Sequence, residues 1–350
     1  MHIRENVSLA PFTTLGVGGA TRFFATVSEE IHVAEALSFA RSRSLPVFAL
    51  GGGSNLVVAD AGFDGLVLKI EIPGIRQLDG DGRLTVGAGV QWDAFVQYCV
   101  DNDLAGVEAL SGVPGTAGGA PIQNIGAYGR EVGETITKIR AWDTLSETIV
   151  ELSRAECAFA YRSSIFNTSN AGRYIVLQTE FLLQPHGRPR LRFIELQKRF
   201  INGSDPSLAE VRKTVFDIRK SKGMVIDVND PDSRSAGSFF RNPVISRDEY
   251  AAMEQKARDR GIIARSETIP CFDASEGNVK LAAAWLIERS GFSKGFAHGR
   301  VGISTKHTLA LVNLGGAQAA EIVSFMELIK EKVMASFGAA LHPEPVFIGF

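Results

Sequence analysis

The sequence lacks the features that mark several large classes of protein. Only three of its 350 residues are cysteines, and Cys99, Cys157 and Cys271 lie too far apart to form a disulfide framework or a Cys-x-x-Cys metal site. The six histidines form no His-x-x-x-His or His-Glu-x-x-His pair, so no metal site is expected. No apolar run reaches membrane-spanning length, and no secretory signal is recognisable. We therefore expect reduced, buried cysteines and a cytoplasmic location.

A strong charge of one sign is also missing. Lys and Arg number 37, Asp and Glu number 39, and the formal net charge is −2. Since the charges are interspersed and form no basic stripe, we expect no nucleic-acid partner and no membrane partner. Hydrophobic residues make up 45% and charged residues 22%, as in ordinary globular proteins, and the length suggests two or three domains. Nothing specifies an oligomer, and we expect a monomer.

Glycine, by contrast, is abundant and concentrated in one segment. Residues 111–129 read SGVPGTAGGAPIQNIGAYG, with six glycines in 19 residues and a single ionisable side chain, Tyr128. The apolar and amide residues between the glycines favour an ordered loop, and a long ordered loop inside a compact domain is usually functional. Glycine allows close backbone approach or positive φ. We interpret this segment as a loop whose backbone N–H groups hold a phosphate-bearing cofactor.

A second glycine-rich loop, GGGSN at 51–55, follows the apolar strand PVFAL. A further strand-like segment comes next instead of a helix, which argues against a Rossmann fingerprint. A phosphate would be held by successive backbone N–H groups, helped by the hydroxyl of Ser54. Alone, this motif favours a plain glycine turn. Together with residues 111–129, it predicts two loops gripping one pyrophosphate.

The coarse pattern of elements predicts an α+β protein. Helices and strands alternate up to about residue 183, and the polar stretch QPHGRPRLR at 184–192 reads as a boundary or a mobile loop. Helices are then expected after the capping boxes Ser207-x-x-Glu210 and Ser246-x-x-Glu249, over about 279–290, and over 317–337 with Gly338 past the end.

Three further segments could carry chemistry. Arg162 in YRSSIF could bind a carboxylate or phosphate through its fork, Ser238 in SAGSFFRNP sits among apolar neighbours, and Glu344 is held between two prolines. Local sequence alone favours a solvated arginine at 162 and a turn serine at 238, and for Glu344 it leaves a surface acid and a rigidly held functional acid equally open. His307 in ISTKHTLALVN could face a ligand or be an ordinary core histidine.

Taken in order, GGGSNLVV, SGVPGTAGGAPIQNIGAYG, YRSSIF, GSFFRNP and the final PEP resemble the UDP-N-acetylenolpyruvoylglucosamine reductase (MurB) family, from TTLGVGG to FIGF. The longer, enterobacterial-type subtype is the nearer match. The resemblance implies an α+β fold with a two-part FAD-binding region of the vanillyl-alcohol-oxidase/PCMH type and a C-terminal α+β substrate-binding domain. The implied domains are 1–72 with about 327–350, 73–222, and 223–326.

The resemblance also implies an activity. The family reduces UDP-N-acetylglucosamine enolpyruvate to UDP-N-acetylmuramate with NADPH through non-covalent FAD, in peptidoglycan precursor synthesis, and so serves cell-wall biogenesis, cell shape and division. Arg162 and Glu344 match residues that stabilise the enediolate intermediate, and Ser238 matches the donor of a proton to C2. Because a bare carboxylate would repel an enediolate, we hypothesise that Glu344 is protonated or orients Ser238 or a water.

The binding residues implied by the motifs fall into two groups. Those for the cofactor are Gly51, Gly52, Gly53, Ser54, Asn55, Leu56, Ser111, Gly112, Pro114, Gly115, Gly118, Gly119, Asn124, Ile125, Gly126, Ala127 and Tyr128. Those for the substrate are Tyr161, Lys222, Asn242 and His307.

The chain departs from the family pattern at two places, and two rival functions stay open. Phe193 in LRFIEL stands where a tyrosine usually contacts the substrate diphosphate. The stretch GMVIDVNDPDSRSAG is longer than its counterpart in the enterobacterial-type sequence. One rival is another non-covalent FAD-dependent oxidoreductase of the same superfamily. The other is a non-catalytic sugar-nucleotide-binding module, which the joint presence of Arg162, Ser238 and Glu344 argues against.

Overall fold

The computed structural model describes residues 1–200, 205–274 and 277–350. The described chain forms two compact units, each assembled from separate stretches of sequence. Unit 1 comprises Met1–Val7, Thr21–Gly53 and Phe63–Val225, and unit 2 comprises Ser8–Ala20, Ser54–Gly62 and Ile226–Phe350. In the part of the chain that is described, no helix is both long and apolar enough to cross a membrane.

Unit 1 begins with a four-stranded sheet and a crossover helix. The strand order is β1 (Ile3–Ser8), β2 (Ala20–Val27), β5 (Phe63–Ile70) and β3 (Val47–Leu50). Strands β2 and β3 both run parallel to β5, so α1 (Glu30–Arg41) connects them as a crossover must. The predicted strand PVFAL is therefore confirmed as β3, and it delivers the chain directly into Gly51.

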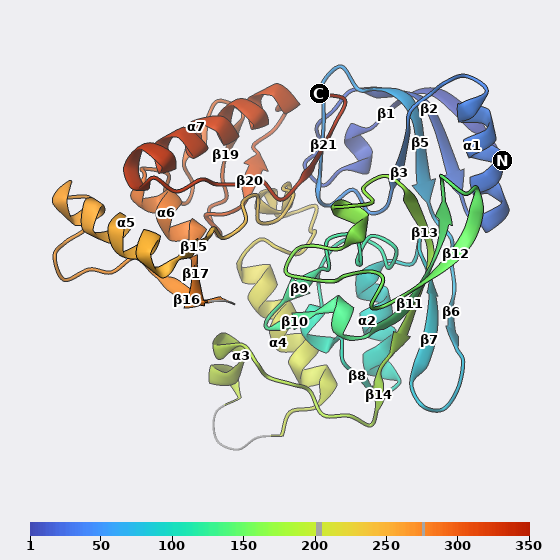
Figure 1. Cartoon of the computed structure of the whole chain (residues 1–350), viewed down its shortest axis with the longest axis horizontal. Coiled ribbons are helices and arrows are strands. Elements are labelled where there is room, and N and C mark those ends of the chain that lie inside the picture. The colour runs from blue at the N-terminus through green and yellow to red at the C-terminus, as the bar shows by residue number, and fades with distance from the viewer. Residues whose placement is uncertain (201–204, 275–276) are drawn as a thin grey trace. The chain divides into compact units, whose positions relative to one another are not determined.

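A five-stranded antiparallel sheet forms the centre of unit 1. Its order is β12 (Thr148–Ser153), β11 (Ile136–Asp143), β13 (Tyr174–Leu182), β7 (Arg83–Gly87) and β6 (Ile75–Gln77). Helix α2 (Trp92–Asp101) lies along this sheet (Figure 1), with the ring of Phe95 4.6 Å from that of Phe181, centroid to centroid. The sheet and α2 share one apolar core that includes Trp92, Leu84 and Val176.

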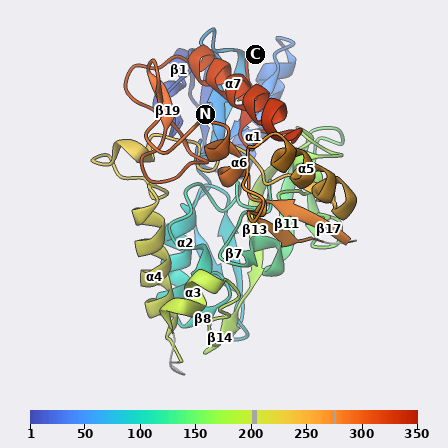
Figure 2. The same ribbon diagram turned by 90° about the vertical axis from the view of Figure 1, so that its left-hand side faces the viewer.

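The rest of unit 1 consists of short elements and two helices. Strand β8 (Leu104–Ala105) pairs with β14 (Gln184–Pro185), and β9 (Gly126–Ala127) pairs with β10 (Arg130–Glu131). The start of the stretch at 184–192, predicted as a boundary or mobile loop, is thus a paired strand, and residues 201–204 further along lie outside the described residues. Helices α3 (Ile194–Arg199) and α4 (Leu208–Ser221) lie together (Figure 2) on a small shared apolar cluster. The predicted capping box opens α4, where Ser207 Oγ accepts the Glu210 N–H at 3.2 Å.

Unit 2 is a second α+β core. Its sheets are β15 (Val244–Ser246), β17 (Asn278–Leu281) and β16 (Cys271–Asp273); β18 (Ala297–His298), β19 (Val301–Ile303) and β20 (Leu311–Asn313); and the parallel pair β4 (Leu56–Val58) and β21 (Val346–Ile348). Helix α5 (Arg247–Asp259) starts at the predicted capping box of Ser246, and α7 (Ala319–Phe337) packs beside α5 and α6 (Ala283–Arg289) (Figure 2). Gly338, with φ +73°, ends α7 as predicted.

One predicted helix is partly wrong. Residues 279–281 of the expected helix over 279–290 belong to β17, and only Ala283–Arg289 is helical. Val279 pairs with Ile245 on one side and Asp273 on the other, so the central position in a sheet decides its conformation.

Candidate functional site

The two glycine loops meet backbone to backbone inside unit 1. A Cβ on Gly52 would lie 2.6 Å from Cα of Gly115, closer than any side chain tolerates. Gly53 adopts φ +64°, which favours glycine. Within the described chain, the N–H groups of Gly51, Gly52 and Gly53 donate no hydrogen bond. Three successive amide donors in a tight turn form a concave anion-binding surface.

Lys69 lies beside this turn, and sequence reasoning missed it. Its Nζ donates to the carbonyl oxygen of Gly51 at 2.5 Å, and burial lowers the pKa of the ammonium group. Lys69 belongs to β5, which pairs with β3 next to the glycines. The signal that could have revealed it is a lysine inside the otherwise apolar strand GLVLKI. Its charge gives the first glycine loop a positive neighbour.

The second glycine loop is anchored by hydrogen bonds from its first turn onward. Ser111 is fully buried, and the Gly112 N–H donates to Asp93 Oδ1 at 2.6 Å. Although burial opposes it, hydrogen bonds from Arg212 and Gly112 hold the pKa of Asp93 below its usual range. The Gly115 carbonyl accepts from the Trp92 N–H at 3.0 Å. The predicted ordered loop is therefore confirmed, because α2 and the half-buried carboxylate of Asp93 fix its shape.

The later part of this loop has a different character. Asn124, with φ +46°, accepts from the Gly133 N–H and donates to Glu131 and to the Ala160 carbonyl, so its side-chain amide holds the loop together. Burial raises the pKa of the Tyr128 hydroxyl to about 12, with Arg219 opposing the shift. Phe193 packs edge-on against Tyr128, the ring centroids being 5.5 Å apart.

Arg162 and Tyr161 lie next to the glycine loop in unit 1. An Arg162 Nη atom donates to the Gly126 carbonyl at 3.0 Å, and its guanidinium lies 5.5 Å from the centroid of the Tyr161 ring. The backbone of Arg162 is left-handed, with φ +53°. A non-glycine residue in that conformation costs on the order of 1–3 kcal/mol and is held there by its surroundings. Such strain is concentrated at functional sites.

In unit 2 the structure brings Ser238, Glu344 and His307 together. The Glu344 N–H donates to the Phe239 carbonyl at 2.8 Å, which fixes the C-terminal segment against the residue after Ser238. Ser238 Oγ lies 3.4 Å from His307 Nε2. All three side chains are half-buried. Their separation in sequence hides this cluster from any local motif.

The remaining predicted substrate residues already have protein partners. Lys222, at the end of α4 in unit 1, forms a 2.8 Å ion pair with Glu195 of α3. In unit 2, Asn242 Oδ1 accepts the Ala283 N–H at 3.0 Å, at the start of α6. A phosphate would therefore compete with Glu195 for Lys222. The side-chain carbonyl oxygen of Asn242 already accepts the hydrogen bond from the first residue of α6.

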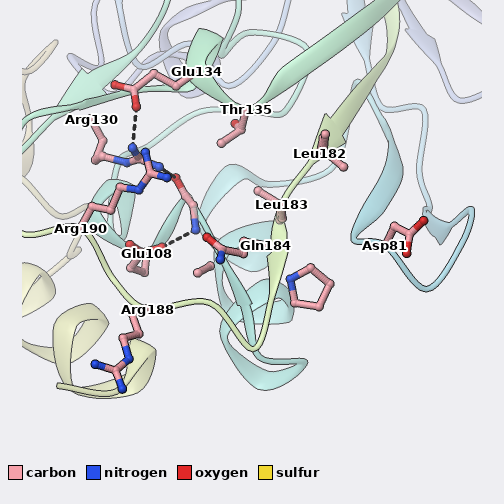
Figure 3. Close-up of a pocket in the computed structure, with 13 residues that line it drawn as sticks. Asp81, Glu108, Arg130, Glu134, Thr135, Leu182, Leu183, Gln184, Arg188 and Arg190 are labelled. Carbon is pink, nitrogen blue, oxygen red and sulfur yellow. Dashed lines mark hydrogen bonds and ion pairs between the residues drawn. The ribbon is translucent and has the colours of Figure 1, made fainter. Parts of the chain in front are cut away.

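A cavity of about 370 Å³ opens in unit 1 (Figure 3), and none of the predicted site residues lines it. Arg130, nearly buried, donates to Glu134 at 2.5 Å and to the Gly106 carbonyl at 3.0 Å. Three acidic and three basic side chains line the cavity (Figure 3), so it presents no excess of either charge to a ligand. Among the described residues, no group of three or more His, Cys, Asp or Glu side chains could hold a metal.

Comparison with known proteins identifies the family. Residues 21–153 match a model described as an FAD binding domain, and residues 230–348 match the C-terminal domain of UDP-N-acetylenolpyruvoylglucosamine reductase. The protein of that name from Thermobifida fusca (strain YX) is 45% identical, with 99% of this chain and 98% of the relative aligned. The chain belongs to the UDP-N-acetylenolpyruvoylglucosamine reductase family.

Other relatives and a solved structure agree with this assignment. The protein of the same name from Streptomyces coelicolor is 43% identical over 99% of this chain and 90% of its own length. The crystal structure of UDP-N-acetylenolpyruvylglucosamine reductase (MurB) from Thermus caldophilus aligns with a TM-score of 0.67 at 24% identity, covering 99% of this chain and all of that one. At that identity the match establishes a shared fold. The predicted α+β fold with a FAD-binding region is confirmed.

The residues of unit 1 fit the FAD that this domain type binds. The paired glycine loops leave a backbone cradle that a Cβ would fill, and the amides of Gly51, Gly52 and Gly53 face no acceptor of the described chain. Lys69 adds a positive charge beside them. These are the groups that a dinucleotide pyrophosphate requires.

Replacing Gly52 by alanine is expected to weaken FAD binding. The new methyl group would collide with Gly115, and forcing extra volume into a tight contact costs about 1–3 kcal/mol, or about 5- to 150-fold in affinity. The measurement is a titration of the deflavinated protein with FAD, followed by flavin fluorescence. Gly80→Ala is the matched control, because a Cβ there meets nothing within 4 Å. Equal affinities for the two variants would contradict the assigned cradle.

Proposed function

We propose that this protein reduces UDP-N-acetylglucosamine enolpyruvate to UDP-N-acetylmuramate, with NADPH as the reductant. The observation that carries the proposal is the full-length match to reductases of this name, 45% identical over 99% of the chain, together with the cluster of Ser238 and Glu344 in unit 2. When bound, FAD supplies a two-electron carrier between NADPH and the enolpyruvyl group. The side chains of the protein then have to manage charge and protons on the substrate.

Arg162 and Ser238 are assigned complementary roles. Addition of hydride to C3 leaves negative charge at C2 and in the neighbouring carboxylate, and the planar fork of Arg162 suits such a dianion. The carbanion-like C2 is a strong base, so the hydroxyl of Ser238 can give it a proton although serine is a weak acid in water. Glu344 is assigned as a protonated acid or as the acceptor that orients Ser238 or a water, because a bare carboxylate would repel the dianion.

The same assignment extends to binding. Tyr161, Lys222, Asn242 and His307 are proposed to contact the substrate, and the predicted residues of the two glycine loops are proposed to contact FAD. Phe193 is proposed to stack on the substrate where a tyrosine would donate a hydrogen bond. The proposal also includes membership of the longer subtype and a division into three domains with boundaries at 72, 222 and 326. It further includes a monomeric state, a cytoplasmic location and a place in cell-wall precursor synthesis.

The test is consumption of NADPH that depends on UDP-N-acetylglucosamine enolpyruvate. We expect turnover on the order of 1–100 per second and a product two hydrogens heavier than the substrate by mass spectrometry. UDP-N-acetylglucosamine, which lacks the enolpyruvyl group, should give no turnover, and NADH in place of NADPH tests the choice of reductant.

Each rival function has its own outcome in this assay. Oxygen consumption with an alcohol or sugar, without reduction of the enolpyruvate, would favour the first rival, another FAD-dependent oxidoreductase of the same superfamily. Purified protein without flavin absorbance that still binds the sugar nucleotide would favour the binding module.

A further inference from the structure

The structure places an imidazole next to the hydroxyl that serves as the proton donor under the proposed function. Ser238 Oγ and His307 Nε2 are 3.4 Å apart, although the two residues are separated by 69 positions in the sequence. Catalytic hydrogen bonds are often long before the substrate is bound. The distance therefore suits proton transfer between the imidazole and the hydroxyl.

Hydrogen bonds hold both partners of this pair. The Phe239 N–H donates to the Leu309 carbonyl at 2.7 Å, so the residue after Ser238 is tied to the turn that carries His307. Within that turn, Ser304 Oγ accepts the N–H groups of Lys306 and His307, at 3.0 and 3.2 Å. Ser304 is fully buried. The approach of the imidazole to the hydroxyl is therefore built into the backbone.

Charged groups surround the turn on several sides. Lys306 forms a 2.7 Å ion pair with Asp230. Asp232, in the η5 turn (Pro231–Ser233), accepts hydrogen bonds from the Thr305 N–H and from the Thr305 hydroxyl. Glu288 of α6 accepts a hydrogen bond from the Thr308 hydroxyl. Glu344 reaches the cluster through its backbone bond to Phe239. Three of these acids bind donors of the turn itself, so the η5 region and α6 hold the turn that carries His307 in place.

We propose that His307 is a positioning residue that aligns the Ser238 hydroxyl and restores its proton. This inference rests on the proposed function. As the Oγ–H bond of Ser238 breaks and the C2–H bond forms, the Nε2–H proton of the imidazolium moves to Oγ, so no free alkoxide accumulates. His307 becomes neutral and regains its proton from water. The step involves no change of oxidation state.

The test compares His307→Gln, Ser238→Ala and the double variant. We expect His307→Gln to lower kcat by about 10- to 100-fold, in addition to any rise in the KM for the enolpyruvate that follows from loss of its proposed substrate contact. Because His307 acts through Ser238, the double variant should be no slower than Ser238→Ala alone. Added imidazole should restore part of the activity of His307→Ala. His298→Gln, an exposed histidine of β18 in the same unit, should keep the parental kcat.

Other outcomes would overturn the inference in distinct ways. A raised KM with unchanged kcat would make His307 a substrate contact only, and rate losses that multiply in the double variant would make it independent of Ser238. Each variant is checked for flavin absorbance and for reduction of the flavin by NADPH, which shows that it is folded. Absence of enolpyruvate-dependent turnover in the parental protein would instead overturn the proposed function.

Discussion

Ser238→Ala is expected to slow formation of product by about 10²- to 10⁴-fold, the usual contribution of a positioned proton donor. Reduction of the flavin by NADPH should proceed at the parental rate, because Ser238 has no part in that half-reaction. The substitution removes one hydroxyl from a half-buried site and leaves the backbone bonds of Phe239 to Leu309 and Glu344 in place. Rapid mixing of NADPH-reduced enzyme with the enolpyruvate measures the affected step directly.

Ser293→Ala is the control for this experiment. Ser293 is an exposed serine of unit 2, and its substitution should change neither half-reaction. If Ser238→Ala formed product at the parental rate while its flavin was reduced normally, another group would have to donate the proton. Ser238→Cys should retain more activity than Ser238→Ala, since a thiol can still donate a proton.

Arg162→Lys is expected to lower kcat by about 10²- to 10³-fold, in the range seen when one preorganised donor to developing charge is removed. Lysine keeps the positive charge and loses the planar fork that matches a carboxylate. It also loses the bond from the guanidinium to the Gly126 carbonyl, which fixes the direction of the side chain. Steady-state kinetics over a range of enolpyruvate concentrations separates the effect on kcat from that on KM.

The matched control for Arg162→Lys is Arg76→Lys, at an exposed position of β6 in the same unit. It should behave as the parental protein. A change confined to KM in Arg162→Lys would mean that the arginine binds the substrate equally in its ground and transition states. FAD content should be unaffected in both variants.

Local signals in the sequence predicted the elements that depend on local physics. The capping boxes at Ser207 and Ser246, the strand that enters Gly51 and the glycine after α7 were all readable, because caps and turns are set by neighbouring residues. The helix expected at 279–290 failed where tertiary pairing overrode propensity, since Val279 sits in the middle of a sheet.

The candidate site was only partly accessible to sequence reasoning. The composition of the two glycine loops was enough to predict them, but their mutual contact at Gly52 and Gly115 depends on the fold. Lys69 stands out as a lysine in an apolar strand, but its hydrogen bond to the Gly51 carbonyl is visible only in the structure. The approach of His307 to Ser238 joins positions 69 residues apart, and no periodicity or spacing encodes it. Long-range contacts of this kind are decided by packing.

The pairing of β4 with β21 also constrains how the chain is made. Leu56–Val58 is buried in unit 2, and the neighbouring residue Asn55 binds the carbonyl of Glu344, 289 positions later. During synthesis, the segments of unit 1 leave the ribosome well before that partner exists, and domains generally fold as they emerge. The apolar strand β4 is therefore synthesised long before β21, the strand with which it pairs. We therefore expect β4 to depend on its pairing with β21 for protection of its apolar residues against aggregation.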